Sequence, residues 1–138
     1  MSIQKQEFYE GAALYALIRS RSRSIRYENP FFVVDEKYCL ILKYSTRKRS
    51  PWGFTFTVDE QNIYKQKVNN KLIIGLICGS DGVAGFNYNE FSKIALPSKM
   101  AIHISCFRNR REQYRISGPD GEMDGKIARS DWLSTLWD

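Results

Sequence analysis

Two short runs of basic residues, each with aromatic neighbours, have the residue types and spacing best suited to chemistry with a polyanion. They are Arg47, Lys48 and Arg49 between Tyr44 and Trp52, and Arg108, Arg110, Arg111 and Arg115 beside Phe107 and Tyr114. Arginine and lysine attract phosphates, and exposed aromatic rings stack on bases. The runs therefore predict a surface that grips a nucleic-acid backbone with little sequence specificity. The alternative is that they are solvated ends of hairpins, since turns are commonly polar.

A third basic segment precedes these two runs. It consists of Arg19, Arg21, Arg23 and Arg26, which alternate with serines for most of its length. The segment has too few apolar groups to pack and too much like charge to fold tightly, so we expect an exposed connector. The net charge of the chain is +6, and residues 19–49 account for all of it with nine bases and three acids. We expect the three basic segments to converge in space into one positive strip.

Nucleophilic and metal chemistry find weaker support in the sequence. His103 is the only histidine, and although Ser105 shares its strand face, no acid is placed to orient it. We expect a half-buried strand histidine. The three cysteines, Cys39, Cys78 and Cys106, each lie in an apolar run and form no Cys-x-x-Cys pair, which predicts buried free thiols rather than a zinc site.

The elements that must position these residues follow from hydrophobic periodicity. An N-terminal helix is predicted over residues 4–19, with Phe8, Ala12, Tyr15 and Ile18 on its buried side together with Leu14 and Leu17. Part of that side is thin, which would let the helix lie close against a sheet, because it carries Gly11, Ala12, Ala13 and Ala16. Strands are predicted over 31–34, 38–45, 53–57, 72–78, 83–86, 100–108 and 113–117, with short helices over 58–68 and 87–96 and a last one beginning at Ser130. The strands at 31–34 and 38–45 should form a hairpin. Together these elements predict one α+β domain over residues 1–138, with a mostly antiparallel sheet packed by the N-terminal helix and short helices at the edges.

The order helix, three strands, helix, strand over the first 78 residues resembles the core of the PD-(D/E)XK nuclease superfamily. That resemblance implies an acid on the first helix, an aspartate on one strand and an acid-x-lysine pair on the next, which together hold Mg²⁺ for phosphodiester hydrolysis. The matching positions are Glu10 for the helix acid, with Glu7 as the alternative, Asp35 for the strand acid and Lys43 for the lysine. Ile41 stands where the family has a carboxylate.

Three functions are therefore open. We favour a non-catalytic nucleic-acid-binding module with no cofactor. The first alternative is a nuclease, either of the resembling type, using Glu10, Asp35, Lys43 and Mg²⁺, or a metal-free RNase. The second is a protein-interaction or inhibitor subunit of a bacterial or phage conflict system. It would bind a partner or a second copy of the chain through the C-terminal helix, whose Trp132 and Trp137 otherwise close the core.

Localisation follows from what the sequence lacks. No apolar run approaches the roughly 20 residues that span a bilayer, and the first residues contain no apolar stretch of the signal-peptide kind. We therefore expect a cytoplasmic protein with no membrane partner.

Overall fold

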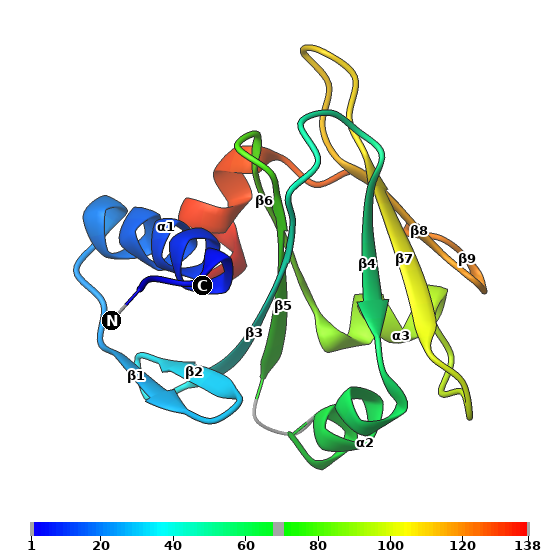
Figure 1. The fold of residues 1–138 in the computed structure, drawn as a ribbon, viewed down its shortest axis with the longest axis horizontal. Helices are drawn as coiled ribbons and strands as arrows, with labels where there is room; N and C mark the ends of the chain where they lie inside the picture. The colour runs from blue at the N-terminus through cyan, green and yellow to red at the C-terminus, as the bar shows by residue number, and fades with distance from the viewer. Residues whose placement is uncertain (1, 68–70, 138) are drawn as a thin grey trace.

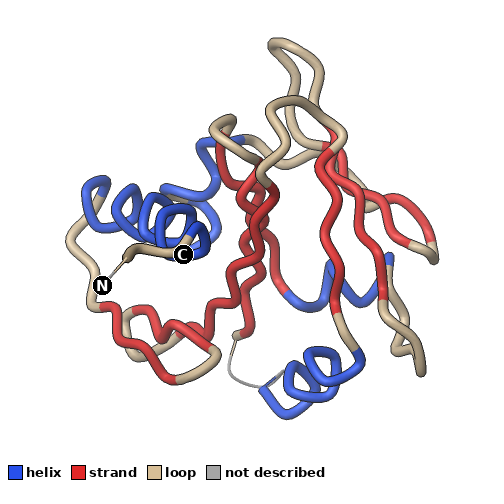
Figure 2. The backbone as a smooth tube through the Cα atoms, in the orientation of Figure 1, coloured by secondary structure: helices blue, strands red, loops and turns tan. Residues whose placement is uncertain are grey.

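The computed structural model describes residues 2–67 and 71–137. Its main layers are the N-terminal helix, a five-stranded sheet and a four-stranded sheet, which lie side by side (Figures 1 and 2). Its helices and strands are α1 (Lys5–Ser20), β1 (Ile25–Glu28), β2 (Phe31–Val34), β3 (Tyr38–Ser45), β4 (Trp52–Phe56), α2 (Val58–Lys67), β5 (Leu72–Cys78), β6 (Gly82–Asn87), α3 (Tyr88–Ile94), β7 (Ile102–Phe107), β8 (Arg115–Gly118) and β9 (Gly121–Glu122), followed by the 3₁₀ helices η2 (Arg129–Leu133) and η3 (Thr135–Trp137). The predicted α+β class is confirmed. No helix in these residues is long and apolar enough to span a bilayer.

The first sheet has the order β1-β2-β3-β5-β6. Strands β3 and β5 run parallel and the other neighbours antiparallel, including the predicted β2–β3 hairpin. Strand β5 is buried along its whole length, as its unbroken apolar sequence predicts for a strand covered on both faces. Strand β1 was not predicted, because its charged residues read as part of the connector. Charged side chains are nevertheless common on an edge strand, where they discourage pairing with another chain.

The second sheet has the order β4-β7-β8-β9 and is antiparallel throughout. We expected one sheet, but β4 leaves β3 after the loop of residues 46–51 and pairs with β7 instead. The alternating sequence of β4 buries Phe54 and Phe56 against the first sheet and leaves Gly53 and Thr55 on the outer face. His103 is also exposed on that outer face, where its Nδ1 lies 3.1 Å from the hydroxyl of Thr55, so the expected half-burial is wrong.

Helix α1 covers the other face of the first sheet with its small residues. Ala13 and Leu17 are buried, whereas Phe8 and Tyr15 are each 63% exposed. The predicted buried side was therefore right for Leu17 and Ala13 and wrong for Phe8, Tyr15 and Ile18, because helical spacing alone does not tell which large apolar residues face the core. The alanines let the helix lie close to the sheet.

The C-terminal segment closes the core beside α1. Trp132 and Trp137 are almost completely buried, and the indole of Trp132 donates a hydrogen bond to the carbonyl of Ala13 (3.2 Å). The hydroxyl of Tyr38 donates to the carbonyl of Trp137 (2.7 Å). The two indoles are thus buried in the core. The alternative in which they contact a partner or a second copy of the chain is therefore wrong.

Candidate nucleic-acid interface

Two of the three predicted basic segments meet at one end of the molecule. The loops β3–β4 and β7–β8 lie beside the β5–β6 turn at the top of Figure 1. The hydroxyl of Ser50 donates to the carbonyl of Arg108 (3.0 Å), and the amide of Gly79 donates to the carbonyl of Ser45 (2.9 Å). We call the surface formed by residues 46–51, 79–82 and 108–115 together with Arg129 the basic end.

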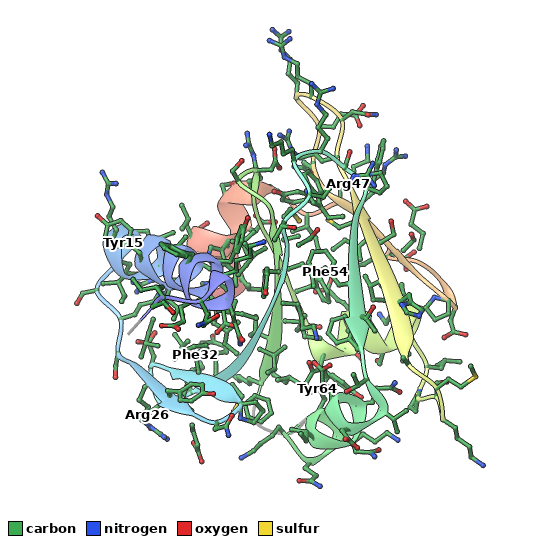
Figure 3. The ribbon with its side chains drawn as sticks, viewed as in Figure 1. Tyr15, Arg26, Phe32, Arg47, Phe54 and Tyr64 are labelled. Atoms are coloured by element: carbon green, nitrogen blue, oxygen red, sulfur yellow. The ribbon has the colours of Figure 1, made fainter. Side chains whose placement is uncertain are left out.

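The basic end presents cations that no carboxylate neutralises. The exposed ones are Arg47, Lys48, Arg49, Arg110 and Arg111, and the described part of the chain supplies no ion pair to any of them. Nitrogen-tipped side chains fan outward from these loops around the labelled Arg47 in Figure 3. Repulsion among these cations would be relieved by a polyanion, so the surface favours phosphate.

Asp81 joins the loops of the basic end. Its carboxylate accepts hydrogen bonds from Nε of Arg108 (2.8 Å) and from the hydroxyl of Tyr114 (2.7 Å). The guanidinium of Arg129 donates to the Asp81 carbonyl (3.2 Å). The hydrogen bonds from Arg108 hold the pKa of Asp81 below its usual value, with a further contribution from Tyr114, although burial opposes the shift. Burial, followed by the hydrogen bond to Asp81, raises the pKa of Tyr114, so the phenol stays protonated.

Changing Asp81 to asparagine is expected to lower the free energy of unfolding by about 2 kcal/mol at neutral pH, because Arg108 and Tyr114 lose a charged acceptor. Since the pKa of Asp81 is lowered by folding, this contribution is present above the ordinary pKa of an aspartate and is lost as the pH falls through the lowered pKa. The difference from wild type should therefore shrink in acid. Urea unfolding at several pH values measures it, with the exposed Asp124→Asn as the control. A difference that stays constant down to strongly acidic pH would contradict this role.

The first basic segment lies elsewhere, so the prediction of one strip formed by three segments is wrong. In Figure 3, Arg26 is near β1 and β2 at the lower left, far from Arg47 at the top. The side chain of Arg23 is only 3% exposed and pairs with Asp35 (2.9 Å), while Arg26 pairs with Glu36 (2.8 Å). The β1–β2 register, which sets Ile25 opposite Val34, brings these arginines beside the acids of the β2–β3 turn.

The helix end of that segment contributes exposed residues. Arg19 lies in the last turn of α1, and Arg21 follows as its C-terminal cap. Arg19 lies one turn after Ala16 and beside Leu133 of η2, so neither it nor Arg21 belongs to the loops of residues 46–51 and 108–115. The fold thus brings together the predicted site residues of 47–49 and 108–115. It does not bring the predicted residues of 19–26 to them.

Trp52 was expected to stack on bases, but it is buried. Its indole nitrogen donates to the carbonyl of Arg47 (2.8 Å), and its ring meets Tyr114 edge-on with centroids 6.2 Å apart. Trp52 and Tyr114 are therefore part of the core on which the loops rest. The guanidinium of Arg115 lies 5.0 Å from the centre of the Phe107 ring, so this cation already makes a cation–π contact within the protein.

The three nuclease positions implied by the family resemblance are not brought together. Glu10 lies on α1, which packs on the Leu40 and Leu42 face of the first sheet, whereas Lys43 lies on the opposite face of β3. Asp35 lies in the turn before β3, so roughly 17 Å of strand separates the start of β3 from Lys43. Lys43 therefore shares no site with Glu10 or with Asp35.

The surroundings of Lys43 do not fit a Mg²⁺ site either. The amine of Lys43 donates to Glu60 (2.7 Å) and lies 5.1 Å from the centre of the Phe56 ring. Burial would raise the pKa of Glu60, but hydrogen bonds from Lys43 and Thr57 outweigh it and lower the pKa, so Glu60 is a carboxylate. Ile41 and Phe31 fill the adjacent space as part of the apolar core. Within residues 2–67 and 71–137 no three His, Cys, Asp or Glu side chains cluster in a way that could hold a metal.

The buried thiols agree with the sequence prediction. All three cysteines are free and buried, and the Sγ atoms of Cys78 and Cys106 lie 3.7 Å apart where the two sheets meet. Burial and this contact raise the pKa of Cys78, which keeps it a neutral thiol. The cysteines are therefore part of the core that supports the basic end.

Sequence reasoning missed Asp81, Arg129 and Glu60. The sequence did not single out Asp81, because its partners lie 27 or more residues away in the chain. A signal was present in part: an aspartate inside a turn that directly follows a fully buried strand lies at the same sheet edge as neighbouring strand ends.

Comparison with known proteins gives one distant structural likeness to report. No family model matches the chain, and no curated protein matches it. Among solved structures, the chain is similar to Hjc, a Holliday junction resolvase from the archaeal hyperthermophile Archaeoglobus fulgidus, with a TM-score of 0.49 and 12% sequence identity. The alignment covers 72% of this chain and 83% of that chain.

Proposed function

We propose that this protein is a non-catalytic module that binds the phosphate backbone of a nucleic acid through its basic end. The observation that carries the proposal is the convergence of two loops, far apart in sequence, that hold five exposed cations without a carboxylate partner among the described residues. A backbone phosphate occurs at each nucleotide, so a compact group of cations at the tips of adjacent loops can neutralise several phosphates at once.

A non-catalytic role is supported by the state of the nuclease positions. Hydrolysis of the family type needs carboxylates grouped around a metal and a lysine free to contact the attacking water or the phosphate. Here Lys43 is held by Glu60, and Ile41 is buried in the core. The sheet face that would carry the chemistry is instead packed against the second sheet.

A salt titration tests the proposal. Fluorescence anisotropy with labelled duplex DNA, single-stranded DNA and RNA should give binding that weakens linearly on a log–log plot against salt concentration. The expected slope for duplex DNA is about −4, because each of the five exposed cations can neutralise roughly one phosphate. Incubation with Mg²⁺ should leave the strands intact on a denaturing gel. Absence of binding at about 50 mM salt would overturn the proposal. Cleavage that disappears in Lys43→Met would establish the nuclease alternative instead.

A protein-interaction role is a second candidate, favoured by one observation. Phe8, Tyr15 and Ile18 are more than half exposed and recur at helical spacing on the outer side of α1. A row of exposed apolar side chains on one helix is typical of a contact surface. Sedimentation analysis of wild type and Tyr15→Ser tests for self-association through this row, and a monomer at every concentration for both proteins would count against that contact.

A further inference from the structure

A groove lies between α1, the β5–β6 turn and η2, and it has a volume of about 430 Å³. Its floor is apolar, formed by Ala12 and Ala16 of α1, Ile77 of β5 and Val83 of β6, with Leu133 at one side. The groove is open because α1 presents alanines there, since any larger side chain at these positions would fill it. Its size falls in the range of pockets that hold small organic groups.

The rim of this groove belongs to the basic end. Gly79, Ser80, Asp81 and Gly82 line it on one side, and Arg129 lies at its mouth with a side chain that is 54% exposed. At Gly79 the backbone of the β5–β6 turn touches the Arg47 carbonyl so closely that a Cβ atom would overlap it. A ligand in the groove would therefore be adjacent to the loops that carry the exposed cations.

Polar groups at the rim are available to a ligand. The hydroxyls of Ser80 and Ser130 line the groove, and neither donates or accepts a side-chain hydrogen bond within the described residues. The groove thus combines apolar surfaces, a few free hydrogen-bonding groups at one edge and positive charge at the mouth. A nucleotide has matching properties, because the faces of its base are apolar, the edge of its base is polar and its phosphate is anionic.

We propose that the groove binds an unpaired base of a nucleic-acid strand whose phosphates lie on the basic end. Bases inside a continuous duplex have their faces stacked and their edges paired, so they cannot enter without being flipped out. The protein should therefore prefer single strands, or strands with an unpaired nucleotide, over continuous duplex. This inference rests on the proposed function and adds the form of nucleic acid that is bound.

Two comparisons test the inference. The first uses wild-type protein with a labelled short oligothymidylate and with an abasic strand of the same length, which keeps the phosphates and removes the bases. The oligothymidylate should bind about tenfold more tightly, in the lower part of the range for one held base. Equal binding of the two strands would overturn the inference and leave the proposed function intact.

The second comparison uses Ala12→Phe, which fills the groove, and Gly11→Phe as the matched control. Gly11 neighbours Ala12 on α1 but does not line the groove, and nothing lies within 4 Å of a Cβ atom placed there. Ala12→Phe should lose about tenfold in affinity for the oligothymidylate and keep wild-type affinity for the abasic strand, whereas Gly11→Phe should match wild type with both. Unchanged binding of the oligothymidylate by Ala12→Phe would overturn the inference. If wild type bound none of the probes, the proposed function itself would fail. Circular dichroism of each variant checks that the fold is kept.

Discussion

Replacement of Arg47, Lys48 and Arg49 together by alanine is expected to weaken nucleic-acid binding by about 10- to 100-fold at moderate salt. The three side chains are exposed, adjacent and without ion-pair partners in the described residues, so removing them should leave up to three phosphates unneutralised. The salt dependence should flatten at the same time, by about 2 to 3 in the slope of the log–log plot. Anisotropy titrations of wild type and the variant at several salt concentrations measure both quantities.

A charge-matched variant separates the surface from the overall charge. Lys65, Lys93 and Lys99 are exposed and lie on α2, on α3 and in the loop between α3 and β7, at the end of the molecule opposite the basic loops (Figure 1). Their replacement by alanine removes the same three charges but should change affinity by less than about threefold at moderate salt, since screening limits charges beyond about 10 Å. Equal losses in the two triple variants would show that net charge, rather than the basic end, drives binding.

Replacement of Trp132 by alanine is expected to lower the free energy of unfolding by about 4 kcal/mol. The indole is only 2% exposed and lies against Gly75 and Gly85, which leave room for it in the paired strands β5 and β6. Its nitrogen also donates to Ala13 and so links the C-terminal segment to α1. Alanine would leave a large cavity between the helix layer and the sheet. Urea unfolding followed by the fluorescence of Trp52 and Trp137 measures the loss.

Leu133→Ala is the control for the Trp132 prediction. Leu133 is the next residue in the same 3₁₀ helix, but it is 38% exposed. Its replacement should cost about 1 kcal/mol or less, because little apolar area leaves the core. Similar losses for the two variants would mean that the C-terminal segment contributes through its backbone and that the indole is dispensable.

Local sequence patterns predicted most of the elements of the fold. Strand β5 was evident from its unbroken apolar run, and the β2–β3 hairpin from two apolar runs around a polar corner. The division into two sheets was not predictable in this way, because whether β4 pairs with β3 or with β7 depends on the path of the loop between them. The buried side of α1 was predicted only in part for a related reason: Leu17 and Ala13 face the sheet as expected, but the pattern did not show that Phe8, Tyr15 and Ile18 face outward.

The candidate site was also predicted only where its residues are close together in the sequence. The cations at 47–49 and 108–111 were found because each cluster is local in sequence. The ion pairs of Arg23 and Arg26 could not be predicted, since their pairing with Asp35 and Glu36 depends on the register of β1 against β2. Asp81 was hidden for the same physical reason, because its importance comes from Arg108, Tyr114 and Arg129, which only the folded chain brings to it.

The hydrogen bonds that tie the loops of the basic end together have a thermodynamic consequence. Because Ser50 is fixed to Arg108 and Trp52 to Arg47, the two loops are already tied to each other and to the core at their bases before a ligand arrives. Association then costs mainly the immobilisation of the long side chains, rather than the folding of a flexible arm. Such a receptor should bind with a smaller entropic penalty from its main chain than a flexible arm would carry.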